Sequence, residues 1–114
     1  MNTEMIFGLV IISLVALIME LIGIFQLNKK GEPVGFYNLE APPKKENITD
    51  IEKWNKKHGM IWILYGASIE LGFWFGYIVP SDVLAPILLM GGVVIPIPFM
   101  IMRHNSLVKK YWKK

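Results

Sequence analysis

Three long apolar runs alternate with polar segments along the chain. The runs cover residues 5–27, 60–79 and 83–102, and each is close to the roughly 20 mainly apolar residues that a helix needs to cross a bilayer. The polar segments between them are a long loop, residues 28–59, and a short turn, residues 80–82. This pattern predicts an all-α fold: an integral membrane bundle of three helices.

The composition favours a single membrane domain. Hydrophobic residues make up 54% of the 114 residues and the mean hydropathy is +0.44, values that are high for a water-soluble domain of this size. The polar remainder is too small and too charged to form a second core. The chain contains no cysteine, which excludes disulfide bonds and thiolate metal sites. We therefore expect one transmembrane domain over residues 1–114.

The basic residues predict the orientation of this domain. Seven of the twelve lie in the loop of residues 28–59, and the other five follow the third run. Because two spans separate these segments, a three-span topology places all twelve on one side, which the positive-inside rule makes cytoplasmic. The N-terminus then lies outside and the C-terminus inside, in a multi-pass protein of the plasma membrane. The basic residues suit anionic lipid headgroups and accompany no nucleic-acid motif, so we expect a lipid partner and no nucleic acid.

A helix is expected to begin before the second apolar run. Thr49 and Glu52 have the spacing of a capping box, in which the Thr49 side chain accepts a hydrogen bond from the Glu52 amide. The helix that follows would lie along the membrane surface, and Gly59 would allow a bend where it enters the span.

The second run carries a strip of small residues. Ser68, Gly72 and Gly76 recur at four-residue intervals, and small residues spaced in this way let another helix approach closely. The strip predicts helix packing inside the same chain, with a homo-oligomeric contact as the alternative.

The third run is predicted to be a kinked helix. Pro96 and Pro98 lack amide protons, so they free the carbonyls of Gly92 and Val94. Lipid cannot satisfy those carbonyls, and they need partners in protein, water or a bound solute. A kink that serves only packing is the simpler explanation.

Two glutamates inside the apolar runs are the main candidate functional residues. A charged residue at a helix centre costs about 2.5–3.5 kcal/mol, so such residues usually face a bundle interior. Glu20 and Glu70 lie roughly 10 and 15 Å from the same boundary. With Ser13, Ser68 and Gly92 they are predicted to line a small polar cavity that binds a ligand or proton. The structural alternative is that both glutamates stay protonated and donate to freed carbonyls.

The sequence offers little support for an enzyme. His58 and His104 lie at the ends of the second and third runs, but the chain has no HxxxH or HExxH spacing. It also lacks the GxSxG and GxxxxGK[ST] patterns of hydrolases and nucleotide-binding loops. We expect no metal, no cofactor and no catalysis.

The segment "GFYNLEAPPKKENITDIEKWNKKHGMIWILYG" resembles small Firmicutes membrane proteins related to the sporulation-delaying-protein immunity (SdpI-like) family. Phe36 and Tyr37 stand where that family usually has a basic residue. The resemblance implies immunity to a membrane-active peptide, or signalling from it, without enzymatic turnover. The matching positions are Gly35, Thr49, Trp54, Asn55, His58 and Gly59.

Two other functions remain open at this stage. The size of the chain and its glutamate in the first span are similar, by analogy, to small multidrug resistance transporters. That analogy implies a proton-coupled cation transporter in which Glu20 or Glu70 binds proton and substrate in competition. The third possibility is an accessory subunit whose spans dock onto a larger membrane protein.

Overall fold

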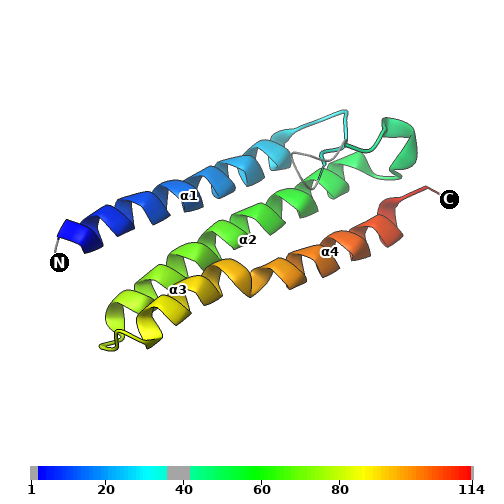
Figure 1. Cartoon of the computed structure of the whole chain (residues 1–114). Helices are drawn as coiled ribbons and strands as arrows, with labels where there is room; N and C mark the ends of the chain where they lie inside the picture. The colour runs from blue at the N-terminus through cyan, green and yellow to red at the C-terminus, as the bar shows by residue number, and fades with distance from the viewer. Residues whose placement is uncertain (1–2, 36–41, 114) are drawn as a thin grey trace.

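The computed structural model describes residues 3–35 and 42–113, and in these segments the regular structure is helical (Figure 1). Three stretches are long and apolar enough to cross a membrane, the third formed by two successive helices. The elements are α1 (Thr3–Asn28), the 3-10 turn η1 (Lys45–Asn47), α2 (Ile51–Ile78), α3 (Leu84–Val94) and α4 (Pro96–Tyr111).

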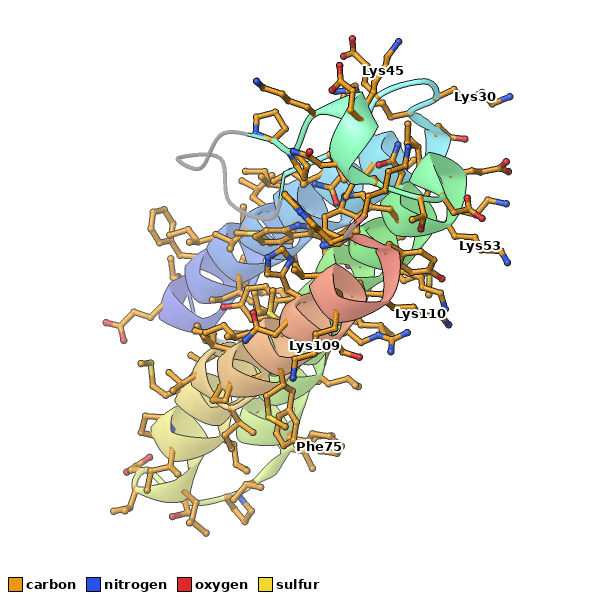
Figure 2. The ribbon with its side chains drawn as sticks, turned by 90° about the vertical axis from the view of Figure 1, so that its right-hand side faces the viewer. Lys30, Lys45, Lys53, Phe75, Lys109 and Lys110 are labelled. Carbon is orange, nitrogen blue, oxygen red and sulfur yellow. The ribbon has the colours of Figure 1, made fainter. Side chains whose placement is uncertain are left out.

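Helix α2 is the centre of the arrangement. Both α1 and the α3–α4 pair pack against it, and the N- and C-termini lie at opposite ends of an elongated molecule measuring 53 × 22 × 20 Å. Figure 2 shows Lys30, Lys45 and Lys53 gathered at one end, here called the loop end, and Phe75 near the other.

Helix α2 is longer than a bilayer core is thick. Its 28 residues extend about 42 Å, against roughly 30 Å of hydrocarbon. The excess belongs at the loop end, where Lys53, Lys56 and Lys57 occupy its first two turns. In a bilayer of this thickness residues 51–58 would lie outside the hydrocarbon, and the spanning part of α2 would begin near Gly59.

The start of α2 differs from the predicted capping box by one residue. Asp50 is the N-cap, and its Oδ1 accepts the Lys53 amide at 3.1 Å. An aspartate suits this position because it pairs with a free amide and carries negative charge at the positive end of the helix dipole. Thr49 instead donates its own amide to the Tyr111 carbonyl at 2.7 Å. Helix α2 then continues without interruption through Gly59, so the surface helix and the span are one element.

Glycines bring α1 and α2 into close contact. A Cβ atom on Gly59 would lie 2.5 Å from the Gly23 carbonyl oxygen, and one on Gly23 would lie 2.5 Å from the Gly59 oxygen. Two turns further along α2, a Cβ on Gly66 would lie 2.8 Å from the Ala16 oxygen. Any larger residue at these positions would force the backbones apart.

The small-residue strip of α2 packs against α3 of the same chain. A Cβ atom on Gly72 would lie 2.9 Å from the Gly92 Cα, and one on Gly76 would lie 2.8 Å from the Ala85 oxygen. A Cβ on Gly92 would lie 2.7 Å from the Ser68 oxygen. The contact is thus the internal one of the two alternatives drawn from the sequence.

The third span is divided at Ile95, just before the proline pair. Ile95 itself has helical dihedral angles (φ −59°, ψ −39°) and donates its amide to the Gly91 carbonyl at 3.0 Å. Pro96 offers no amide to the Gly92 carbonyl, and that oxygen accepts a hydrogen bond from Ser68 Oγ at 3.0 Å instead. A side chain of α2 therefore satisfies the carbonyl that the sequence predicted to be free.

The best-buried apolar cluster lies at the loop end rather than between the spans. Much of the apolar surface of the spans is exposed, as lipid contact requires. The end of η1 and the residue after it are tied to the end of α4, since Ile48 and Trp112 form an antiparallel bridge and Lys113 donates its amide to the Asn47 carbonyl at 2.7 Å. The clustered side chains are Val34, Ile48, Trp54, Ile61, Leu107 and Tyr111.

Candidate functional site

Three neighbouring side chains of α2 form the buried polar centre of the loop end. Trp54, Asn55 and His58 are each 0% exposed. Trp54 and His58 lie one turn apart on the same face, with ring centroids 4.1 Å apart. Polar groups buried to this degree must be hydrogen-bonded, and each has specific partners in the loop or in α4.

Trp54 and Asn55 together hold Val34. The Val34 amide donates to Asn55 Oδ1 at 2.9 Å, and the Val34 carbonyl accepts from Trp54 Nε1 at 2.9 Å. Asn55 Nδ2 also donates to the carbonyls of Lys29 (3.0 Å) and Glu32 (2.9 Å). One buried amide side chain thereby fixes the segment that leaves α1.

Two further features shape that segment. Gly31 has a positive φ of 86°, a left-handed conformation that side chains disfavour, and it allows the chain to turn back after α1. Gln26, near the end of α1, is also buried, and its Nε2 donates to the Gly35 carbonyl at 3.3 Å. The loop is therefore held from both α1 and α2.

His58 connects α2 to α4. Its Nδ1 lies 2.9 Å from the Trp54 carbonyl oxygen, and its Nε2 lies 2.9 Å from His104 Nδ1. A carbonyl only accepts, so the network assigns the proton of neutral His58 to Nδ1 and leaves Nε2 to accept from His104 Nδ1–H. We call Gly35, Trp54, Asn55, His58 and His104 the loop-end cap.

The surroundings of His58 keep its imidazole neutral. Burial lowers the pKa of His58 from 6.5 to about 4, because a charged ring would lose its hydration. The hydrogen bond to the Trp54 carbonyl favours the charged ring and opposes this shift, whereas the positive charges of His104 and Arg103 reinforce it. His58 is therefore neutral at physiological pH and links α2 to α4 through its two hydrogen bonds.

The side chains of the cap hold the loop segment and join α2 to α4. Both nitrogens of His58 are engaged in hydrogen bonds. Within residues 3–35 and 42–113, no group of three or more His, Cys, Asp or Glu residues is placed to hold a metal ion.

The two glutamates lie along the seam between α1 and α2. Glu20 Cγ and Oε1 would be 2.6 and 3.2 Å from a Cβ on Gly66, and Glu70 follows Gly66 by one turn on the same face. Both carboxyl groups are half-buried. In the described part of the chain neither makes a hydrogen bond or ion pair.

The same seam sets the register of the two glutamates. The close approaches of Gly23 to Gly59 and Ile63, and of Gly66 to Ala16 and Glu20, set an antiparallel register in which residues 62–66 of α2 lie opposite Glu20. Glu70 lies one to two turns further along α2. Ser13 belongs to the same face of α1 and is half-buried.

The residues predicted to line one polar cavity are divided between two sides of α2. Ser68 and Gly92 meet in the seam with α3, whereas Glu20 and Glu70 lie in the seam with α1. The carbonyls near the proline pair take their hydrogen bonds from hydroxyls, since Tyr65 Oη also donates to the Val93 carbonyl at 2.9 Å. These hydroxyls occupy the role that the structural alternative gave to protonated glutamates.

The cap gathers residues singled out on sequence, and its hydrogen-bond partners Val34 and Gln26 are residues that the sequence analysis missed. Trp54 and Asn55 bind the loop segment at Val34, and Gly35, the next residue of that segment, accepts a hydrogen bond from Gln26. Val34 had no signal of its own, because it contributes only main-chain groups to the polar contacts. Phe36 and Tyr37, where the sequence departs from the family pattern, lie outside the described residues.

The two prolines of the third span lie at the start of α4. Pro98, like Pro96, lies in the first turn of α4, where the absent amide is tolerated because no intrahelical partner is needed.

Family models, curated protein sequences and solved structures give no match to this chain.

Proposed function

We propose that this chain is a non-enzymatic plasma-membrane protein that gives immunity to, or signals from, a membrane-active peptide. The observation that carries the proposal is the convergence of the SdpI-like positions Gly35, Trp54, Asn55 and His58 in one buried cap. The cap holds the loop on α2 and joins α2 to α4, and Gln26 holds the same loop from α1. A change in helix packing caused by a peptide would then alter the loop on the cytoplasmic side.

The proposed orientation places the cap in the cytoplasm. The basic residues favour a cytoplasmic loop end, with the N-terminus and the turn between α2 and α3 outside. A peptide arriving from outside would meet that turn and the exposed apolar faces of the spans, where Phe7 is 67% and Ile78 is 70% exposed. In this proposal the third helix bends at the proline pair, and the spans rearrange about that point.

The test is survival of a heterologous bacterial host exposed to the sporulation-delaying toxin. Cells that express the chain should outgrow cells with an empty vector. Asn55→Ala should remove most of the protection because it releases the loop, and Lys56→Ala should keep it, because Lys56 is exposed and pairs only with Glu52 on the same helix. No gain in survival at confirmed membrane expression would remove the immunity proposal.

A second candidate function rests on Glu20. Its half-buried carboxyl group within a span has no hydrogen bond or ion pair among the described residues, and a group in that position is suited to exchange a proton for a cation. Liposomes containing the protein and a pH-sensitive dye test this. Glu20→Gln should abolish cation-driven proton release, and Glu4→Gln, at an exposed glutamate in the first turn of α1, should leave it intact. Undetectable release by the wild-type protein across several organic cations would count against transport.

A further inference from the structure

A groove of about 410 Å³ lies between α2 and α4, outside the cap. Its volume is in the range of small-molecule sites, roughly 300–1,000 Å³. It is open rather than enclosed, and two of its walls carry well-exposed apolar side chains, Leu64 at 62% and Phe99 at 66%. The lining is mainly apolar along the spans and becomes cationic at the loop end.

The two charged residues of the lining are both positive. Lys57 and Arg103 contribute the charge, and no acidic residue accompanies them in the groove. Neither cation has an ion pair among the described residues. They lie at the same level, because each is the chain neighbour of one member of the His58–His104 pair. This end of the groove therefore attracts an anion.

The position of the groove relative to the bilayer indicates the kind of anion. The spanning part of α2 begins near Gly59, so Lys57 lies at the level of the lipid phosphates. From Lys57 to Tyr65 the groove extends about 12 Å toward the hydrocarbon. The Tyr65 hydroxyl already donates to the Val93 carbonyl, and the deep part is otherwise formed by apolar side chains.

We propose that the groove binds one anionic phospholipid. The phosphate lies between Lys57 Nζ and the Arg103 guanidinium. The guanidinium can donate two parallel N–H hydrogen bonds to two phosphate oxygens. One acyl chain follows the apolar part of the groove over Met60, Leu64 and Phe99. Basic pockets between spanning helices on the cytoplasmic side are suited to such headgroups. The bound lipid bridges α2 and α4 beside the cap, and this assignment is independent of the proposed function.

Native mass spectrometry of the purified protein tests the headgroup. The protein is incubated in mild detergent with phosphatidylglycerol or phosphatidylcholine of equal chain length. Two positive charges near the surface predict a preference of about 30-fold for the anionic lipid. The double variant Lys57→Gln/Arg103→Gln should reduce the preference to near one. The matched control Lys30→Gln/Lys109→Gln removes the same charge from exposed sites outside the groove and should keep it.

A groove-filling variant tests the acyl chain. Leu64→Trp keeps both cations but occupies the apolar part of the groove, and it should lose the retained lipid while its helix content by circular dichroism stays unchanged. Glycerol 3-phosphate, which has the headgroup chemistry without chains, should not displace the lipid at equal concentration. The proposal is overturned if the groove and control double variants retain anionic lipid equally. It is also overturned if phosphatidylcholine binds as well as phosphatidylglycerol, if Leu64→Trp retains lipid like the wild type, or if glycerol 3-phosphate displaces it.

Discussion

Replacing Asn55 by alanine should release the loop from the helices. The side chain is completely buried and makes three hydrogen bonds to main-chain groups: one from the Val34 amide and two to the carbonyls of Lys29 and Glu32. Alanine removes all three at once. It leaves the helix intact, because alanine is the best helix former.

The magnitude follows from the burial of each bond. The bond with Val34 is fully buried, and a buried donor left without a partner costs about 1–3 kcal/mol. The bonds to Lys29 and Glu32 are partly buried, so water can replace Asn55 there and the loss is nearer the net value of about 0.5–1.5 kcal/mol each. Together the free energy that holds the loop closed should fall by about 2–6 kcal/mol.

Hydrogen exchange of the Val34 amide measures this directly in labelled protein in micelles. A loss of about 2–6 kcal/mol corresponds to exchange faster by about 30-fold to about 25,000-fold when exchange is limited by the opening equilibrium. Asn55→Asp keeps an oxygen that accepts from Val34 and should protect this amide better than alanine does. Lys56→Ala, on the exposed side of the same helix turn, should leave the rate within about twofold of wild type.

The reasoning would be refuted by an Asn55→Ala protein whose Val34 amide exchanges no faster than in Lys56→Ala. That result would mean that Asn55 does not hold the loop. Equal acceleration of amides throughout the spans would instead show global unfolding, and it would contradict the local nature of the contact.

Three further predictions address the seams and the histidine pair. Gly59→Ala should destabilise the protein by about 1–3 kcal/mol, because its Cβ would lie 2.5 Å from a carbonyl oxygen of α1. Gly8→Ala should not destabilise it, because the atom nearest to that Cβ is 3.9 Å away. Thermal unfolding in detergent compares the two variants. Burial lowers the pKa of His58 from 6.5 to about 4, so the unfolded chain binds a proton at this site more readily than the folded chain does. The unfolding free energy should therefore fall by up to about 3 kcal/mol as the pH drops from about 6.5 to about 4. Equilibrium unfolding should show this fall, and the same fall in His58→Gln would contradict it. Ser68→Ala should lower the unfolding free energy by about 1 kcal/mol, because it removes the donor to the Gly92 carbonyl. In a double-mutant cycle Pro96→Ala should reduce this loss, because it restores an amide that can bond to the same carbonyl. Fully additive effects of the two substitutions would argue against the hydrogen bond.

The sequence predicted the spans well because a bilayer imposes one rule on every residue between its boundaries. Apolar runs of sufficient length identified all three stretches, although helix α2 begins before its run. The charged first turns of α2 are helical because Asp50 caps them and Trp54 and Asn55 bury against the loop. Hydropathy carries no information about such contacts.

The site was harder to predict because it depends on which faces meet. Helical spacing did not tell which face of α2 packs against which span, so Ser68 and Glu70 were predicted to line one cavity although they lie in different seams. The freed carbonyl of Gly92 followed directly from the chemistry of proline, whereas its donor depended on the register of α2 against α3. Val34 bonds to the cap through its main-chain amide and carbonyl, and almost every residue type has these groups, so the sequence does not reveal its role.

The central claim is that this chain crosses the membrane three times with its cap in the cytoplasm. Because it contains no cysteine, single substitutions can be labelled without a background. On intact cells, a membrane-impermeant maleimide should label Asp82→Cys in the turn between α2 and α3, and should label Lys45→Cys and Lys113→Cys only after the cells are permeabilised. Labelling of all three positions from the same side of the membrane would contradict the account.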